Sequence, residues 1–356
     1  MSATLQSARK TVVIVDDSKT MRLWLRSVLD QDPRLEVIGE AADALEARQM
    51  IRTQSPDVIT LDVEMPGMDG LEFLELLMRL RPMPVVMVSG ATAQGSETAV
   101  TALALGAVDC LLKPTKIADP RTCDDIQRRV RSAACSNVQQ HAHQRYRQKT
   151  TMPLNLEGQT APIILIGAST GGVAALETVL TALDPNGPPV VIVQHMPQNF
   201  LASFSRRLSG LLKQRVRFAE DRMLLECGDI VIAPEKGWHT EITRWCGNWQ
   251  TVLQPNAKKT PHCPSVDALF SSAVSHGHDV IAALLTGLGR DGAEGLHSLR
   301  CSGARTLAQD KESCVIYGMP RVAKELGAVE QMLTLRDIPG AINIAARTHA
   351  RARLKL

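Results

Sequence analysis

A serine set among glycines, at residues 167–172, is the strongest chemical signal in the sequence. The apolar residues 162–166 before it predict a strand, and the apolar residues 173–176 after it predict the first turn of a helix. Glycine lets the backbone turn sharply between the two, and the free N–H groups at the start of a helix point back toward that turn. Ser169 is therefore a candidate nucleophile with donors for a developing negative charge beside it.

Two further residues have the chemistry that a serine nucleophile needs. His195 ends the apolar run at 190–193, and Asp291 follows the apolar run at 280–285. The carboxyl ends of parallel strands lie at one edge of a sheet, so we expect all three side chains at that edge. In such a set the acid orients the imidazole, the imidazole takes the hydroxyl proton, and backbone N–H groups hold the oxyanion.

Each of these residues also has a plainer interpretation. A histidine at a strand end can hydrogen-bond only to its neighbours, and Asp291 could cap a helix that begins at Ala293. A dinucleotide-binding turn would need glycine at position 169 and an acid where Gln194 and His195 stand. The nucleophile elbow of α/β-hydrolases matches Gly-x-Ser-x-Gly, but it follows several strands of its domain, whereas Ser169 follows the first.

Acidic residues gather at other strand ends, nearer the N-terminus. Asp16 and Asp17 follow the apolar run at 12–15, and Asp62 ends the run at 58–61. Two like charges ~4 Å apart repel by ~4 kcal/mol at an effective dielectric near 20, so three converging carboxylates call for a cation. Oxygen ligands of this kind suit Mg²⁺. The alternative for each acid alone is a solvated loop residue.

A hydroxyl and a lysine complete this second constellation. Ser89 ends the run at 85–88, and Lys113 follows the run at 110–112. One carboxylate would accept a phosphoryl group, the metal and Lys113 would neutralise its oxygens, and the Ser89 hydroxyl would follow the new charge.

The elements that must position these residues form two α/β domains. Residues 1–135 alternate five short apolar runs with amphipathic stretches, as a doubly wound, flavodoxin-like sheet of five parallel strands should. Residues 136–160 are polar and lack a period, which indicates a linker. Residues 161–350 predict a Rossmann-like α/β domain with a mainly parallel sheet, whose strands fall at 163–166, 190–193, 230–232, 280–285 and 304–307. Residues 240–253 predict a β-hairpin, and residues 345–356 predict a basic helix end or a basic tail.

Composition excludes several classes of protein. The chain has 356 residues, a formal net charge of +3 and eight scattered cysteines without a Cys-x-x-Cys pair, which predicts reduced thiols. No apolar run has membrane-spanning length and no signal-peptide pattern begins the chain, so we expect a cytoplasmic protein without membrane insertion. No helix-turn-helix pattern or dense basic face indicates nucleic-acid binding. We expect a monomer.

Residues 10–130 resemble the response-regulator receiver domain, on the strand-end residues above and on the loop at 65–70. The resemblance implies that Asp62 is the phosphoacceptor, that a histidine kinase is the phosphodonor, and that Asp16, Asp17, Asp62 and the carbonyl of Glu64 hold Mg²⁺. Ser89 and Lys113 would sense the phosphoryl group. Cys110 departs from the pattern, because receivers usually have an aromatic residue there.

The remainder resembles the catalytic domain of the chemotaxis protein-glutamate methylesterases, the CheB family. The resemblance is carried by residues 167–172, 194–197, 233–234, 264–270 and 286–292. It implies hydrolysis of glutamate γ-methyl esters on the cytoplasmic helices of chemoreceptors, without a cofactor for that step, and often deamidation of receptor glutamines. It makes Ser169 the nucleophile, His195 the general base and Asp291 its orienting acid, with Thr170 and Leu288 at the oxyanion or substrate.

Several points stay open at this stage. The family's loop usually reads Gly-Met-Gly-Asn-Asp, so Leu288 and Arg290 depart from it. Arg290 either adds positive charge for the substrate or points to solvent, and we favour solvent. Trp238 and His239 either line a cleft or pack, and a Cys/His nucleophile at 262–263 lacks a turn to present the thiol. A receiver that blocks the Ser169 edge until Asp62 is phosphorylated would explain why the halves are joined. The alternative is a response regulator whose output domain only binds.

Overall fold

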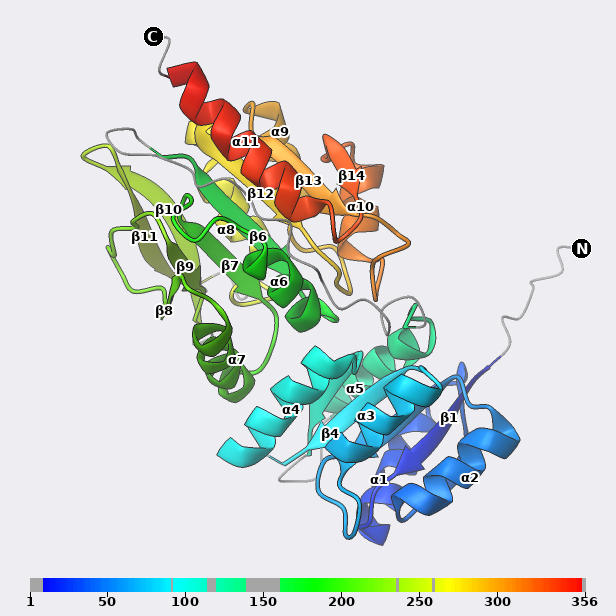
Figure 1. Cartoon of the computed structure of the whole chain (residues 1–356). Helices are drawn as coiled ribbons and strands as arrows, with labels where there is room; N and C mark the ends of the chain where they lie inside the picture. Colours follow the sequence, from blue (N-terminus) through cyan, green and yellow to red (C-terminus); the bar gives the residue numbers. More distant parts are fainter. Residues whose placement is uncertain are drawn as a thin grey trace, which may run out of the picture. The chain divides into compact units, whose positions relative to one another are not determined.

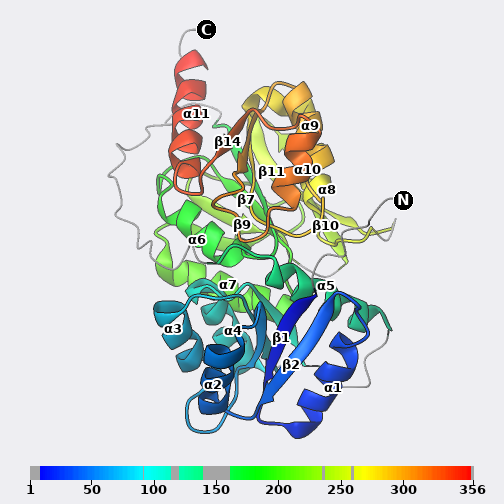
Figure 2. The same ribbon diagram turned by 90° about the vertical axis from the view of Figure 1, so that its right-hand side faces the viewer.

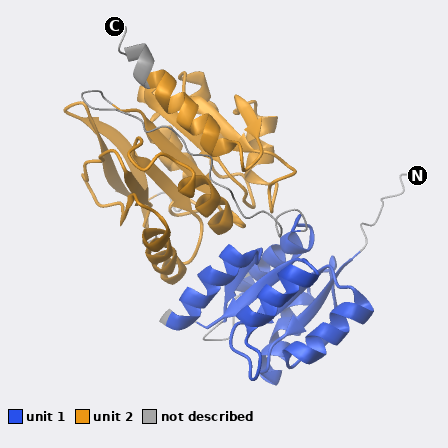
Figure 3. Cartoon of the chain, in the orientation of Figure 1, with its two compact units in different colours: residues 1–143 blue, residues 144–356 orange. Residues whose placement is uncertain are grey.

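The computed structural model describes residues 9–90, 92–113, 120–138, 161–234, 237–257 and 260–353. The chain divides into two compact units, residues 1–143 and residues 144–356 (Figure 3). Most of the linker expected at 136–160 lies outside the described residues, so the domain bounds remain a prediction. No helix in the described part of the chain is long and apolar enough to cross a membrane.

The first unit is a sheet of five parallel strands with helices on both faces (Figure 1). The strand order is β2-β1-β3-β4-β5, with α1 and α5 on one face and α2, α3 and α4 on the other (Figure 2). This confirms the predicted doubly wound, flavodoxin-like fold. The strands are β1 (Lys10–Val15), β2 (Leu35–Ala41), β3 (Val58–Asp62), β4 (Val85–Ser89) and β5 (Asp109–Leu112). The helices are α1 (Lys19–Leu29), α2 (Ala44–Gln54), α3 (Gly70–Leu80), α4 (Ala93–Leu105) and α5 (Pro120–Ala134).

Local sequence explains why these elements begin where they do. Ser18, Asp43, Asp69 and Thr92 precede α1 to α4, and each side chain accepts a hydrogen bond from a backbone N–H of the first turn. The central strands are buried along their whole length, as covering helices on both faces require. The caps therefore end each strand-to-helix loop close to the carboxyl edge of the sheet, where the acidic residues lie.

The second unit is a sheet of seven parallel strands in the order β14-β13-β12-β6-β7-β9-β8. Helices α6, α7 and α11 lie on one face of it, and α8, α9 and α10 on the other (Figure 2). The strands are β6 (Ile163–Ala168), β7 (Val190–Gln194), β8 (Arg215–Phe218), β9 (Asp229–Ile232), β12 (Val280–Leu284), β13 (Arg305–Gln309) and β14 (Gln331–Leu333). The helices are α6 (Gly172–Thr181), α7 (Gln198–Leu211), α8 (Val266–Ser272), α9 (Ala293–Cys301), α10 (Met319–Glu325) and α11 (Ile338–Arg353).

The Rossmann-like prediction, its hairpin and its C-terminal helix are confirmed. Strands β10 (Trp238–Trp245) and β11 (Asn248–Pro255) form the antiparallel hairpin. The prediction missed β8 and β14, which have four and three residues and lie at the two edges of the sheet. Their sequences, Arg-Val-Arg-Phe and Gln-Met-Leu, are not the continuous apolar runs by which the central strands were predicted, and pairing with β9 and β13 makes them strands.

Candidate active site and candidate phosphorylation site

Ser169 is the first residue after β6 and lies between two neighbouring strand ends. Its N–H donates to the carbonyl of Thr286, 3.1 Å away, just beyond β12. Its own carbonyl accepts the N–H of Gly172 at 2.8 Å, which closes the turn into α6. Gly171 has φ +78°, in the left-handed region that favours glycine. The turn predicted from the glycines is therefore present and presents Ser169 at the carboxyl edge of the sheet.

His195 reaches the same edge on the neighbouring strand. Ala168 pairs with Gln194 in the β6–β7 register, so Ser169 and His195 each lie one residue beyond a paired position. His195 Nε2 lies 2.9 Å from Asp291 Oδ2. Among the described residues no hydrogen bond joins Ser169 to the imidazole, and His195 Nδ1 is buried without a partner. The structure thus forms the histidine–aspartate pair and leaves the serine–histidine hydrogen bond unmade, as is common before substrate binds.

Asp291 is buried and accepts four hydrogen bonds. Its Oδ2 accepts from Val266 N at 2.8 Å in addition to the His195 contact, and its Oδ1 accepts from Ser265 Oγ at 2.8 Å and Asp267 N at 3.0 Å. Burial opposes ionisation, but the hydrogen bond and charge of His195, with the backbone N–H groups of Val266 and Asp267, hold the pKa of Asp291 well below its usual range. The helix-cap interpretation is wrong for α9, because Asp291 binds the start of α8 instead.

A second carboxylate lies beside this one. Asp267 accepts the N–H of Gly295 at 2.7 Å through its side chain. Burial and the charge of Asp291 raise the pKa of Asp267 to about 6. The pKa of Asp267 is therefore above that of an ordinary aspartate and the pKa of Asp291 is below it. Of the two, Asp291, which contacts His195, is the one that stays ionised.

The segment at 260–265 contributes a residue that sequence reasoning did not assign to the site. The ring of His262 stacks on the ring of His195, with centroids 4.4 Å apart and planes 8° from parallel. His239 anchors the segment, since its Nδ1 accepts the N–H of Ser265 at 3.2 Å and its Nε2 lies 3.3 Å from Thr260 Oγ1. His239 therefore packs, whereas Trp238 remains 41% exposed. In the sequence, His262 stands just before the segment 264–270 that resembles the CheB family, and this position was the signal that could have assigned it to the site.

The loop at 287–290 lies against the serine. A Cβ atom on Gly287 would come 2.8 Å from Ser169 Cβ, which explains the glycine and places Leu288 next to the turn. Thr286 lies at the base of this loop, and its hydroxyl is 3.0 Å from the carbonyl of Thr170. Arg290 points to solvent and pairs with Glu294 at 2.5 Å, both side chains being two-thirds exposed. The structure favours the solvent interpretation of Arg290.

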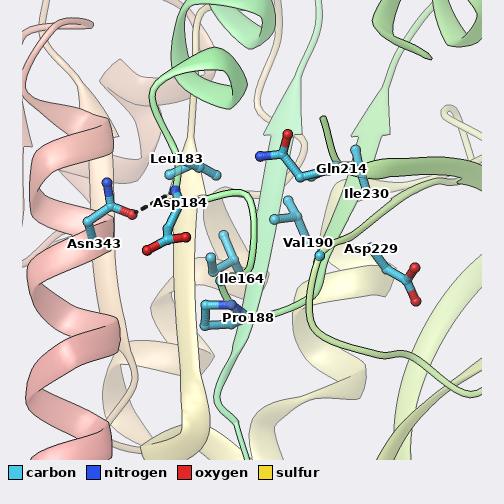
Figure 4. A pocket seen from close by; sticks show the side chains of 11 residues that line it. Ile164, Leu183, Asp184, Pro188, Val190, Gln214, Asp229, Ile230 and Asn343 are labelled. Carbon is cyan, nitrogen blue, oxygen red and sulfur yellow. Dashed lines mark hydrogen bonds between the residues drawn. The ribbon is translucent and has the colours of Figure 1, made fainter. Parts of the chain in front are cut away.

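A small cavity lies at the other edge of this sheet. It is lined by residues near the amino ends of β6, β7 and β9, together with Asn343 of α11, whose Oδ1 accepts the N–H of Asp184 at 3.4 Å (Figure 4). Ser169, His195 and Asp291 are not among its lining residues. The candidate active site is therefore the carboxyl edge and not this cavity.

In the first unit, Asp16, Asp17 and Asp62 converge as predicted. One oxygen from each lies within 4.8 Å of the other two. Lys113 Nζ is 2.6 Å from Asp62 Oδ2 and 3.2 Å from Asp16 Oδ2, yet Asp16 Oδ2 has no hydrogen bond within the described residues. Burial and the charge of Asp16 raise the pKa of Asp62 to about 6, against the opposing effect of Lys113. Three carboxylate oxygens that converge on one point fit a hard cation such as Mg²⁺.

The remaining residues of this site have other contacts. The Ser89 hydroxyl lies 3.0 Å from the carbonyl of Gly95, in the first turn of α4. Glu64 donates its N–H to Asp62 Oδ1 at 3.3 Å. Cys110 is buried in β5, and burial raises the pKa of its thiol. In this structure the hydroxyl expected to follow a phosphoryl group therefore contacts the helix backbone instead.

Comparison with known proteins agrees with both halves. The family model of the CheB methylesterase matches residues 164–342, and that of the response regulator receiver domain matches residues 12–122. A protein-glutamate methylesterase/protein-glutamine glutaminase 1 of Caulobacter vibrioides is 45% identical over 343 residues, 94% of this chain and 97% of the relative. A protein-glutamate methylesterase/protein-glutamine glutaminase of Agrobacterium fabrum is 45% identical over 93% of this chain and 95% of the relative. The crystal structure of the Thermotoga maritima CheB methylesterase catalytic domain is 33% identical, with a TM-score of 0.49, over 52% of this chain and 98% of that one. The chain therefore belongs to the CheB methylesterase family and carries a receiver domain ahead of its methylesterase domain.

Proposed function

We propose that the second unit hydrolyses glutamate γ-methyl esters on the cytoplasmic helices of chemoreceptors. The observation that carries the proposal is the pair of His195 and ionised Asp291 on the strand ends that flank Ser169. Relatives named for this reaction match nearly the whole chain. Among the described residues of this site, we find no feature that favours the alternative of an output domain that binds without catalysis.

The hydrogen-bonding pattern sets the roles of the two imidazole nitrogens. Because an ionised Asp291 only accepts hydrogen bonds, the neutral imidazole that a general base requires has its proton on Nε2 and its lone pair on Nδ1. Nδ1 then takes the proton of the Ser169 hydroxyl as Oγ attacks the ester carbonyl. The carbon–oxygen bond to the methoxy group breaks, and His195 returns the proton so that methanol leaves. Water, activated by the same nitrogen, cleaves the acyl-serine to the free glutamate and restores Ser169.

The tetrahedral intermediates need donors for their oxyanion. We assign these to backbone N–H groups at Thr170 and Leu288, because both lie on the turns that flank Ser169. One such donor contributes about 10²–10³-fold in rate, and general-base assistance about 10²–10⁴-fold. Methionine-to-leucine variation at 288 is compatible with this assignment, since the backbone and not the side chain would donate.

The same residues would also deamidate receptor glutamines. Attack by Ser169 on a side-chain amide gives the same acyl-serine, because His195 protonates the amide nitrogen as its bond to carbon breaks and ammonia leaves in place of methanol. The relatives' names include protein-glutamine glutaminase.

The receiver unit would control this chemistry by phosphorylation at Asp62, with a histidine kinase as donor. Asp16, Asp17, Asp62 and the Glu64 carbonyl would hold Mg²⁺, which supplies charge neutralisation for the phosphoryl oxygens. Lys113 already contacts the acceptor carboxylate. Ser89 would have to release the Gly95 carbonyl to reach a phosphoryl group, which would move the start of α4.

Release of methanol from methyl-labelled receptor tests the proposal. We expect hydrolysis by the full chain and none by Ser169→Ala, while the variant still accepts phosphate at Asp62. Hydrolysis retained by Ser169→Ala would exclude the proposed nucleophile.

A further inference from the structure

We propose that Gln194 is a positioning residue that sets the spacing between Ser169 and His195. The inference rests on the function proposed above. The geometry that carries it is a single side-chain amide that donates to the backbone carbonyls of both residues.

The side chain of Gln194 continues the hydrogen bonding between β6 and β7 just beyond the last backbone hydrogen bond of these two strands. The last ladder bond between β6 and β7 runs from His195 N to the carbonyl of Ala168, at 3.0 Å. Beyond it, Gln194 Nε2 donates to the carbonyl of Ser169 at 2.9 Å and to the carbonyl of His195 at 3.0 Å. Both hydrogens of the amide are therefore used, and they tie the nucleophile's strand end to the base's strand end. Only the NH₂ group can serve two carbonyls, which settles the orientation of the amide.

The cost of this arrangement argues against a purely stabilising role. Gln194 is 3% exposed, and its Oε1 is buried without a hydrogen-bond partner. An unpartnered buried oxygen destabilises a fold, so an apolar side chain would suit the core better. What the glutamine provides instead is two donors aimed at the residues that react.

The glycine that begins α6 supports the same inference. A Cβ atom on Gly172 would lie 2.1 Å from Gln194 Oε1 and 2.9 Å from Ala168 Cβ. Gly172 is helical and has no left-handed φ, so its conformation does not require glycine. The space is required because the Gln194 side chain passes beneath the first turn.

The consequence concerns the unmade bond between Ser169 and His195. The two residues come from different strands, and the hydroxyl must come within hydrogen-bonding range of Nδ1 for proton transfer. A displacement of about 1 Å in such a pair costs on the order of 10²-fold in rate. Gln194 acts on the backbone of both residues, so its loss would alter the reaction and not the affinity for substrate.

The test compares Gln194→Met with wild type in the phosphorylated full chain. Methionine keeps the length of the side chain and removes both donors. We expect kcat for methanol release to fall on the order of 10²-fold with KM unchanged, and labelling of Ser169 by a fluorophosphonate to slow in parallel. The matched control is Gln250→Met, because Gln250 Nε2 also donates to a backbone carbonyl, that of Arg222 at 2.9 Å, on the hairpin. The control should leave both rates unchanged.

A second substitution, Gly172→Ala, would disturb the Gln194 side chain without changing residue 194 itself. Gly172→Ala should displace the amide and lower kcat, and in the double variant the two losses should not fully multiply, because the shortest contact of the new methyl group is with Gln194. If Gln194→Met fails to fold, kcat of Gly172→Ala alone tests the inference, and a wild-type kcat would contradict it.

Two pairs of outcomes separate the inference from the proposed function. Wild-type rates in folded Gln194→Met, or full multiplication of the two losses, would overturn the role of Gln194 while leaving the esterase intact. Absence of methanol release by the wild-type chain, or full activity of Ser169→Ala, would overturn the function itself.

Discussion

Replacing Asp291 by asparagine tests the electrostatic basis of the active site most directly. Each carboxylate oxygen accepts two hydrogen bonds, Oδ1 from Ser265 and Asp267 and Oδ2 from His195 and Val266. Asparagine keeps one accepting oxygen and gains an NH₂ group. Whichever way the amide turns, its NH₂ faces a backbone N–H that cannot accept, so at least one buried donor loses its partner.

If the NH₂ group replaces Oδ1, His195 keeps its proton on Nε2 but loses the negative charge beside it, so the larger effect comes from the other orientation. If the NH₂ group replaces Oδ2, His195 must accept at Nε2, its proton moves to Nδ1, and the nitrogen that we propose deprotonates Ser169 can no longer act as a base. The equivalent change of tautomer in the serine-protease triad costs about 10⁴-fold in kcat. An unpaired buried donor costs about 1–3 kcal/mol, and about 2–4 °C in melting temperature per kcal/mol is usual for a domain of this size. We therefore expect a folded protein with a lower melting temperature and almost no hydrolysis.

The assay is methanol release from methyl-labelled receptor, with thermal unfolding measured on the same samples. The structure offers a matched control in Asp279, which directly precedes β12. Its carboxylate oxygens lie 2.8 Å from His349 Nε2 and 2.8 Å from the guanidinium group of Arg244. Asp279→Asn should lower the melting temperature and leave hydrolysis unchanged. Hydrolysis by Asp291→Asn within a few-fold of the control would refute the assigned tautomer and the role of Asp291.

Three further outcomes are expected. Because the pKa of Asp291 is lowered in the folded state, its contribution to stability is complete above the ordinary aspartate value of about 3.9 and is lost as the pH falls below it. Urea unfolding between about pH 4 and pH 2, below the range in which Asp267 titrates, should therefore show a smaller loss for Asp291→Asn than for wild type, and equal losses would contradict the lowered pKa. His262→Ala should lower kcat about 2- to 10-fold, with most of it restored in His262→Phe, since a stacked ring pair contributes about 0.5–1.5 kcal/mol. Steady-state kinetics measures both, and a loss in His262→Phe as large as in His262→Ala would exclude stacking as the cause. Residues 155–356 alone should demethylate receptor faster than the unphosphorylated full chain, and an equal or lower rate would rule out inhibition by the receiver.

Much of the architecture was predictable because short-range patterns specify it. Alternating apolar runs and polar loops predicted both parallel sheets, and the turn residues Gly247 and Asn248 predicted the hairpin. The missed strands β8 and β14 show the limit, since three or four residues at a sheet edge become a strand only through the partner they meet.

In the candidate sites, too, the positions of the residues were predictable, whereas some of their contacts were not. Strand-end positions of Ser169, His195 and Asp291 could be predicted, because every parallel strand delivers its next residue to the same edge. The sequence did not predict that Asp291 binds the start of α8, or that Ser89 contacts Gly95. Each of these two hydrogen bonds joins a side chain to the backbone at the start of a helix, and it forms only because folding brings the two together.

The sequence by itself determined the order of the elements, the turn that carries Ser169 and the chemical types available at each sheet edge, because backbone preferences and apolar periodicity are local. Only the tertiary structure decided which imidazole nitrogen faces the acid, which ring stacks on His195 and which amide ties the two strand ends together. Those contacts join residues that lie far apart in the chain, such as His195 and Asp291, or Gln194 and Ser169. Their geometry is set by sheet register and packing, which no local pattern encodes.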